Sequence, residues 1–324
     1  MKRREFLGVL GGAVGAAWPV AIYAQEADRK YRLGLLVPAP RQSPAIAAFF
    51  DELRANGFAE GQNLIVSFGG FDVRNEQISE GVKAVIASSP DAIVGGPELY
   101  ARALQAETKT IPILSMSEDL VGAGLAASLA RPGGNVTGIS LLSPELDGKR
   151  QGLLMEAVPG ARRIATLVDA NTTPTHHLDA LRAAANSRGV EATFYPIKKA
   201  DEIGDALEAA KTKDAEAINV LATSLFFVNG QRIIDQAAML RLPAIFQWPE
   251  MADLGGLLGY GPPFTEVYRQ RARQVAKVLR GAKPSEIPVE QPVKFELVIN
   301  LKTAKAIGCE VPAGMVLRAD RLIE

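Results

Sequence analysis

The sequence contains few of the residues from which metal sites and disulfide frameworks are built. Its 324 residues include one Cys and two His, too few for a cysteine-cluster metal site or a disulfide scaffold. An excess of one charge is also absent, because 36 Lys and Arg balance 36 Asp and Glu. A nucleic-acid-binding protein needs a basic surface to neutralise phosphates. We therefore expect neither a metal ion nor a nucleic-acid partner.

Motifs of common enzyme families are missing as well. The chain has no P-loop, no Gly-x-Ser-x-Gly nucleophile elbow and no His-Glu-x-x-His. His176 and His177 are adjacent, so on a helix they point about 100° apart, and we expect both to be solvated at a helix start. Residues 122–127 match Gly-x-Gly-x-x-Ala but follow the fourth expected strand, whereas a dinucleotide site needs this motif after the first. We expect no cofactor and no enzymatic activity.

The apolar stretch near the N-terminus is too short to cross a membrane. It runs from Phe6 to Trp18, 13 residues, whereas a bilayer span needs about 20. With basic residues before it and the small residue Ala24 after it, the segment 1–24 is typical of a signal peptide. Arg3-Arg4 matches the twin-arginine export motif, while Lys2 before the pair leaves Sec export as an alternative. The expected location is the periplasm, after cleavage near Ala24.

Beyond this segment, short apolar runs alternate with amphipathic stretches in two similar halves. Continuous apolar runs are typical of parallel strands buried on both faces, and apolar residues three and four apart are typical of helices. Strands are expected over 33–37, 64–68, 92–94, 111–115, 136–141, 164–168, 192–197, 217–221, 244–246 and 257–260, and residues 295–299 are also strand-like. Helices are expected over 43–56, 76–87, 98–107, 174–188, 203–211, 228–240 and 264–279. The alternation predicts an α/β fold with two Rossmann-like lobes, each built on a parallel sheet.

Polar and aromatic residues gather where the expected strands end. Open α/β sheets bind ligands outside the carboxyl ends of their strands, so these residues are candidates for a ligand site. Hydroxyl groups can donate hydrogen bonds to a carboxylate, and a Trp beside a Pro can stack on an apolar ligand. The candidates are Ser43, Pro97, Glu98, Ser117, Glu118, Asn171, Thr173, Thr223, Ser224, Phe226, Gln247, Trp248 and Tyr260.

Some of these candidates have competing structural roles. Ser43, Thr173 and Ser224 could be helix N-caps only. Glu98 and Glu118 could be solvated loop acids, and Trp248 could be a core residue. For a carboxylate ligand we expect Ser117, Thr173 and Ser224 to donate hydrogen bonds with help from Gln247, and Trp248, Tyr260 and Phe226 to contact the apolar part.

Three segments together resemble a known protein family. They are residues 119–125 (DLVGAGL), 131–138 (RPGGNVTG) and 292–308 (PVKFELVINLKTAKAIG). The chain resembles the ABC-transporter substrate-binding proteins of the tryptophan/tyrosine-transporter type over nearly all of its length after the signal segment. The resemblance implies a type I periplasmic-binding-protein fold, two lobes joined by a three-segment hinge, and a small solute held in the cleft between them. It further implies a monomer that delivers its solute to an inner-membrane permease and ATPase.

The resemblance also implies boundaries for the lobes. Residues 28–141 with 262–290 would form the N-terminal lobe, and residues 142–261 the C-terminal lobe. The lobe to which 291–324 belongs stays open. Hinge segments are expected near 141–143, 261–263 and 285–292.

The chain departs from the amino-acid-binding pattern of this family at two places. Relatives tend to carry Thr-Asp-Pro where this chain has Glu118-Asp119-Leu120, and a Gly-Asp-Thr-like run where it has Gln247-Trp248-Pro249. The resemblance therefore does not identify an acid that would hold an α-ammonium group, and both an aromatic amino acid and an amine-free aromatic carboxylate remain candidate ligands. A periplasmic sensor that signals to a membrane receptor, or an exported enzyme on a Rossmann-like fold, remain alternative functions.

Overall fold

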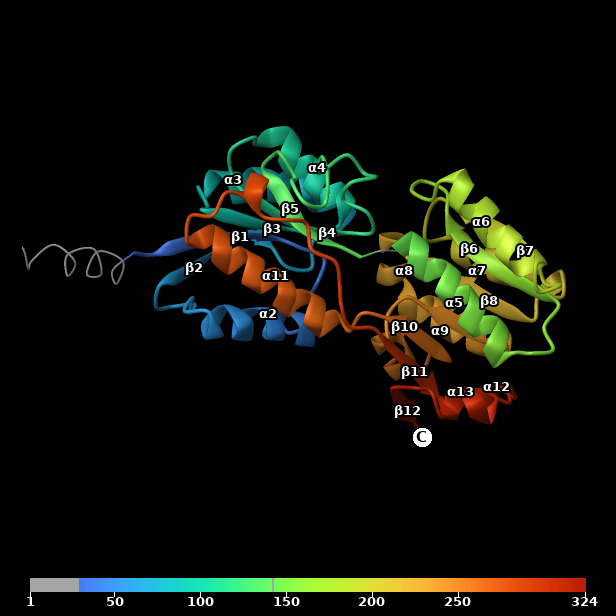
Figure 1. Ribbon diagram of the computed structural model, residues 1–324. Helices are drawn as coiled ribbons and strands as arrows, with labels where there is room; N and C mark the ends of the chain where they lie inside the picture. Colours follow the sequence, from blue (N-terminus) through green and yellow to red (C-terminus); the bar gives the residue numbers. More distant parts are fainter. Residues whose placement is uncertain (1–28, 142) are drawn as a thin grey trace, which may run out of the picture.

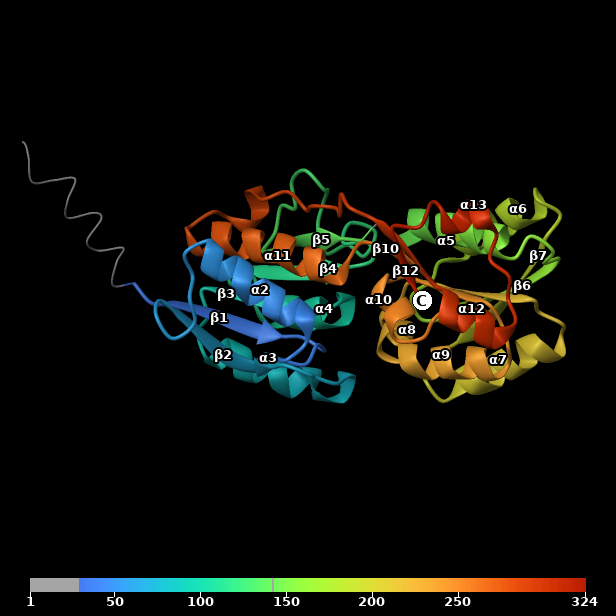
Figure 2. The same cartoon turned by 90° about the horizontal axis from the view of Figure 1, so that it is seen from below.

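The computed structural model describes residues 29–141 and 143–324, which form two α/β lobes lying side by side (Figure 1 and Figure 2). The signal peptide expected over residues 1–24 lies outside the described residues. Within the described ranges, no helix has the length and apolar character that a bilayer crossing requires.

The N-terminal lobe is built on a five-stranded parallel sheet. In spatial order its strands are β2 (Leu64–Gly70), β1 (Tyr31–Leu36), β3 (Ala92–Gly95), β4 (Ile113–Ser117) and β5 (Val136–Ser140). Helices α2 (Pro44–Ala55) and α11 (Phe264–Leu279) cover one face, and α3 (Ile78–Ala87) and α4 (Glu98–Glu107) cover the other. Since both faces are covered, strands β3, β4 and β5 are buried along their whole length, as expected for strands of a parallel sheet between two helical layers.

The C-terminal lobe has a seven-stranded sheet. In spatial order its strands are β12 (Arg321–Ile323), β11 (Glu296–Asn300), β10 (Leu258–Gly261), β9 (Ala244–Phe246), β8 (Ala217–Val220), β6 (Arg163–Asp169) and β7 (Glu191–Ile197). All paired strands are parallel except β10 and β11. The flanking helices are α5 (Ser143–Ala157), α6 (Thr175–Asn186), α7 (Glu202–Thr212), α8 (Ser224–Val228), α9 (Gly230–Met239), α10 (Glu250–Asp253), α12 (Leu301–Ile307) and α13 (Ala313–Val316).

The two parallel-sheet α/β lobes predicted from the alternation are present, but several helices differ from expectation. Helix α5 was not expected, because Gly148 and Gly152 lower its helix propensity and because Asp147, Arg150 and Gln151 interrupt the apolar residues of its buried face. The helix expected over 228–240 is α9, and the short helix α8 just before it was not expected. Helices α12 and α13 and strand β12 were also not expected.

The chain passes between the lobes three times: after β5, after β10 and before β11 (Figure 1). Residue 142, within the first expected hinge segment, lies outside the described residues. From β11 onward the chain belongs to the sheet of the C-terminal lobe, which answers the assignment that the sequence left open.

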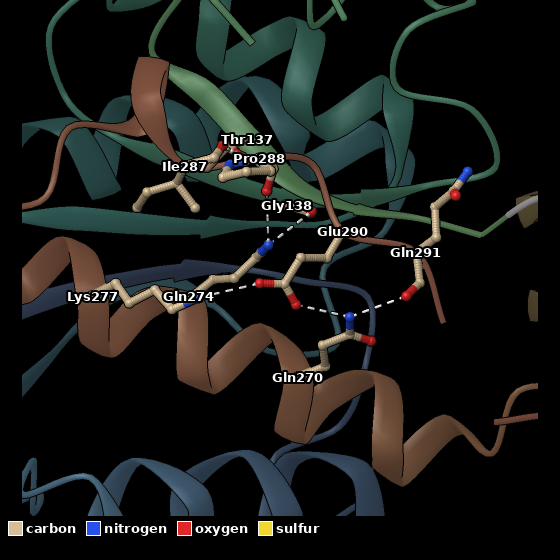
Figure 3. A network of polar contacts seen from close by, with 9 residues as sticks. All are labelled: Thr137, Gly138, Gln270, Gln274, Lys277, Ile287, Pro288, Glu290 and Gln291. Carbon is tan, nitrogen blue, oxygen red and sulfur yellow. Dashed lines mark hydrogen bonds and ion pairs between the residues drawn. The ribbon is translucent and has the colours of Figure 1, made fainter. Parts of the chain in front are cut away.

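The third passage is held against the N-terminal lobe as far as Gln291 (Figure 3). Gln270 on α11 donates through Nε2 to Glu290 Oε2 (2.8 Å) and to the carbonyl of Gln291 (3.1 Å). Lys277 Nζ on the same helix lies 3.3 Å from Glu290 Oε1. The backbone N–H of Ser140 donates to the Glu290 carbonyl at 2.9 Å. Because these contacts hold Glu290 and Gln291, we expect bending in this passage between Gln291 and β11.

Residues just before Glu290 are held in the same way. Thr137 Oγ1 on β5 donates to the carbonyl of Ile287 at 2.8 Å. Gln274 Nε2 on α11 donates to the carbonyls of Gly138 (3.2 Å) and Pro288 (3.3 Å) (Figure 3). The passage is therefore tied to both a strand and a helix of the N-terminal lobe.

Candidate functional site

A cleft lies between the lobes, at the carboxyl ends of their strands. It encloses about 460 Å³ of space outside the protein atoms, part of it open to solvent. The N-terminal lobe contributes residues at or after the ends of β1, β3, β4 and β5, the C-terminal lobe contributes residues after β8 and β9, and α11 supplies the rest. The lining residues are Pro38, Ala39, Gly96, Pro97, Met116, Glu118, Leu141, Ser224, Phe227, Gln247, Trp248, Phe264, Tyr268 and Arg271. This is the edge at which open α/β sheets bind ligands.

Four aromatic rings form one wall of the cleft. The ring centroids of Trp248 and Phe264 are 4.6 Å apart, those of Phe227 and Phe264 5.1 Å, and those of Phe264 and Tyr268 4.9 Å. These separations are typical of favourable edge-on or tilted aromatic pairs, each of which contributes about 0.5–1.5 kcal/mol beyond its buried area. The Trp248 side chain is buried, yet its Nε1 has no hydrogen-bond partner among the described residues. The wall therefore offers an apolar surface with one donor.

The position of Trp248 depends on glycines in the neighbouring strand β10. A Cβ atom on Gly259 would lie 2.5 Å from the Trp248 carbonyl oxygen, and one on Gly261 would lie 2.0 Å from that of Gln247. Only glycine allows so close an approach. Glu250 Oε1, at the start of α10, accepts from the backbone N–H of Phe264 at 2.7 Å, which ties this turn to α11.

Glu118, directly after β4, is an acid in an apolar and acidic environment. Burial is the main reason that its pKa is raised to about 7. A backbone hydrogen bond lowers the pKa in part, and the negative charges of Glu98, Asp169 and Asp147 each raise it by a smaller amount. Asp169 and Asp147 belong to the C-terminal lobe, so this carboxyl group faces the gap between the lobes. Its neighbour Ser117 is buried, with an Oγ that has no partner among the described residues, and it is not a lining residue.

Arg271 is the cation of the cleft, and sequence reasoning missed it. Its side chain is fully buried on α11, and burial lowers its pKa to about 10. The helical periodicity of the sequence could have revealed it. Arg271 lies seven residues after Phe264 and four before Val275, which places it on the apolar stripe of the helix. A charged residue at such a position requires polar partners in the interior.

Five of the residues expected at the site line the cleft together, from both lobes. They are Pro97, Glu118, Ser224, Gln247 and Trp248. Gln247 Oε1 is buried without a hydrogen-bond partner among the described residues.

Two of the expected site residues are helix caps outside the lining. Ser43 Oγ accepts from the backbone N–H of Ile46 at the start of α2, at 3.4 Å. Thr223 Oγ1 accepts from the backbone N–H of Phe226 at the start of α8, also at 3.4 Å. Ser224, by contrast, is the first residue of α8 and lines the cleft.

Two expected aromatic residues lie in the core of the C-terminal lobe. Phe226 is 2% exposed and packs inside, while the next residue, Phe227, lines the cleft. A helix turns by about 100° per residue, so the start of α8 decides which of the two rings faces the ligand side. Tyr260 is buried and stacks on Phe295 with centroids 6.4 Å apart.

The remaining expected residues make local polar contacts outside the lining. Glu98 forms a partly exposed ion pair with Arg102, with 2.7 Å between Oε1 and Nε. Asn171 Nδ2 donates to Asp169 Oδ1 at 3.1 Å. Thr173 donates through its backbone N–H to the Asp169 carbonyl at 3.0 Å.

A buried ionic network that the sequence did not indicate lies in the C-terminal lobe, between α5, α6 and the ends of two strands. Asp147 accepts from Arg150 Nη2 at 2.5 Å and from the backbone N–H of Ala222 at 3.2 Å, and His177 Nε2 lies 3.0 Å from its Oδ2. Arg150 Nη1 also donates to the Tyr260 carbonyl at 3.1 Å. The expectation that His177 is solvated is therefore wrong, because α6 packs this ring against the acid on α5. The network fixes the ends of β8 and β10.

The described part of the chain has no cluster of three or more His, Cys, Asp or Glu side chains arranged to hold a metal ion. The cleft instead combines an aromatic wall, one acid and one buried cation. This set can hold a small molecule that has an aromatic group and charged ends.

Comparison with known proteins identifies a family for this chain. The family model described as ABC transporter substrate binding protein matches residues 36–323. A tyrosine-binding protein of Clostridioides difficile (strain R20291) is 26% identical over 293 residues, covering 88% of this chain and 83% of that protein.

Solved structures with the same fold cover most of this chain. The ABC domain of Streptococcus pneumoniae in complex with L-Trp has a TM-score of 0.79 at 22% identity, over 91% of this chain and 100% of that one. A conserved domain protein of Vibrio cholerae has a TM-score of 0.80 at 25% identity, over 91% and 99%. The lobes thus have the type I periplasmic-binding-protein fold.

Proposed function

The chain belongs to the family of ABC transporter substrate binding proteins, and on that premise we propose that it captures a small aromatic carboxylate in the cleft between its lobes. Aromatic amino acids are the first candidates, because the matched relatives include a tyrosine-binding protein and a domain in complex with L-Trp. Amine-free aromatic carboxylates are the second.

The observation that carries this proposal is the aromatic wall. Trp248 and Phe227 belong to the C-terminal lobe, whereas Phe264 and Tyr268 lie on α11, which packs on the N-terminal lobe. A planar ligand inserted beside these rings would contact both lobes at once. A ligand that contacts both lobes only when they are close together favours the closed arrangement by its differential affinity.

The proposal includes a route for the ligand. The exported protein would bind its solute in the periplasm as a monomer, close about the three passages between the lobes, and deliver the solute to an inner-membrane permease driven by an ATPase. Hinge closure around a ligand is the general behaviour of periplasmic binding proteins.

A ligand panel tests the proposal. The compounds are L-tryptophan, L-tyrosine, L-phenylalanine, indole-3-propionate and tryptamine, with L-leucine and glycine as non-aromatic controls. We expect the aromatic carboxylates to raise the melting temperature, since a ligand at 100 times its Kd adds about 2.7 kcal/mol to the free energy of unfolding. Calorimetry would then give the affinities. Binding of L-leucine without binding of any aromatic carboxylate would refute the proposal.

A further inference from the structure

Two arginines of the described chain are fully buried, and they differ in their partners. Arg150 is paired with the carboxylate of Asp147 at 2.5 Å. Arg271 has no carboxylate of the described residues within 4.0 Å, although its side chain is equally buried. Buried charges are normally paired, because an uncompensated charge in the interior is costly. The unpaired charge of Arg271 therefore needs an explanation.

The guanidinium of Arg271 is held in a fixed plane by backbone carbonyls. Nε and Nη2 donate to the carbonyl of Leu114 at 3.3 and 3.0 Å, and Nη2 also donates to the carbonyl of Gly95. These carbonyls belong to β4 and β3. The centroid of the Tyr268 ring lies 5.5 Å from the guanidinium carbon. The group is thus positioned by groups that do not neutralise its charge.

One nitrogen of this guanidinium remains available to a ligand. Nη1 is buried and has no hydrogen-bond partner among the described residues, and Arg271 lines the cleft. Glu118 lines the same cleft but forms no ion pair with Arg271 within 4.0 Å. A preorganised arginine with a free N–H in an apolar cleft is suited to bind a carboxylate, because charge-assisted hydrogen bonds of this kind are about twice as strong as neutral ones.

We propose that Arg271 is the carboxylate anchor of the cleft, with Nη1 donating to a carboxylate oxygen of the bound solute. The inference rests on the proposed function and deepens it, because it makes the carboxylate group the feature that the site selects. An aromatic ligand without a carboxylate would leave the cation buried and unpaired.

The test compares two probes that differ only at the carboxylate. L-tryptophan and L-tryptophanamide share the ring and the ammonium group, and calorimetry gives the affinity of each for wild type and for Arg271→Met. A hydrogen bond to a charged group contributes enough for wild type to bind the acid about 10- to 100-fold more tightly than the amide. In Arg271→Met this preference should fall to within about threefold. Arg269→Met is the matched control, because Arg269 lies on the same helix and forms a half-exposed ion pair with Glu266; it should keep the wild-type preference.

The outcomes separate the anchor from a structural role. Loss of affinity for both probes in parallel, with the preference retained in Arg271→Met, would overturn the anchor, and so would a wild type that binds acid and amide equally. Failure of the wild type to bind any aromatic carboxylate would instead refute the proposed function, and the anchor with it.

A second measurement does not depend on the variant folding. In a crystal structure of the wild type with L-tryptophan, Arg271 Nη1 should lie within about 3.2 Å of a carboxylate oxygen. A carboxylate bound elsewhere in the cleft would overturn the proposal.

Discussion

Glu118 should make the stability of the protein fall as the pH rises through neutrality. Its pKa is raised from 4.5 to about 7, chiefly by burial, so the folded protein keeps a proton that the unfolded chain has already lost. The free energy of unfolding therefore decreases as the pH rises from about 4.5 to 7, and the full penalty is present above pH 7. At 1.36 kcal/mol for each pKa unit, this penalty is about 3 kcal/mol.

Glu118→Gln removes the titrating group while keeping the shape of the side chain. We expect its free energy of unfolding to exceed that of the wild type by up to about 3 kcal/mol at pH 8 and to equal it near pH 4. Chemical denaturation of both proteins across this range measures the difference. Glu60→Gln, at an exposed ion pair with Arg41, is the control for the removal of a carboxylate outside the cleft. Parallel profiles for wild type and Glu118→Gln would show that this acid titrates normally.

The same titration distinguishes the two classes of ligand that the sequence left open. An ammonium group beside Glu118 favours the charged acid, so the affinity for L-tryptophan should rise by about 30-fold between pH 5.5 and 8.5, where the charged fraction grows from a few per cent to nearly all. The affinity for indole-3-propionate should fall over the same range, because a charged Glu118, together with Glu98, Asp147 and Asp169, repels a carboxylate. Calorimetry with both compounds at several pH values tests the two directions. Flat profiles for both would mean that the ligand does not contact Glu118.

Three further predictions concern the wall, closure and export. Trp248→Ala should reduce the binding free energy for L-tryptophan, measured by calorimetry, by about 2–4 kcal/mol through lost apolar contact and stacking. Phe295→Ala, outside the cleft, should leave the affinity unchanged. Equal losses in the two variants would argue against a role of the aromatic wall in binding. Small-angle scattering should give a smaller radius of gyration with saturating L-tryptophan, and an unchanged radius despite calorimetric binding would exclude closure. Replacing Arg3 and Arg4 with Lys should abolish export by the twin-arginine route; undiminished accumulation in the periplasm would identify Sec.

Much of the candidate site follows from where strands end. Glu118 and Trp248 were found because each follows an apolar run, and the carboxyl ends of parallel strands meet at one edge of a sheet. The position of a strand end does not show whether Phe226 or Phe227 faces the cleft. The start of α8 sets its rotation, and a shift of one residue turns a ring by about 100°. Boundaries at that precision depend on the cap made by Thr223.

Arg271 shows a different limit. The periodicity of α11 places it on a buried stripe, but the sequence does not say whether a carboxylate of the protein meets it there. The groups that surround Arg271 are set by the tertiary structure, since the carbonyls to which it donates lie more than 150 residues earlier in the chain. The network of Asp147 and His177 also could not be predicted from the sequence. Its polar residues interrupt the apolar pattern on the buried face of α5, so the helix itself was not recognised.

The sequence by itself determined the order of most strands and of the longer amphipathic helices, and the identity of the residues at the strand tips, because these depend on local apolar patterns and chain direction. The tertiary structure alone decided which tips converge, which charges are neutralised inside the protein and which remain for a ligand. These depend on the packing of α11 against the N-terminal sheet and on the meeting of two lobes through three separate passages of the chain. A local pattern carries no information about contacts between residues so far apart, and the charge balance of the cleft is set by those contacts.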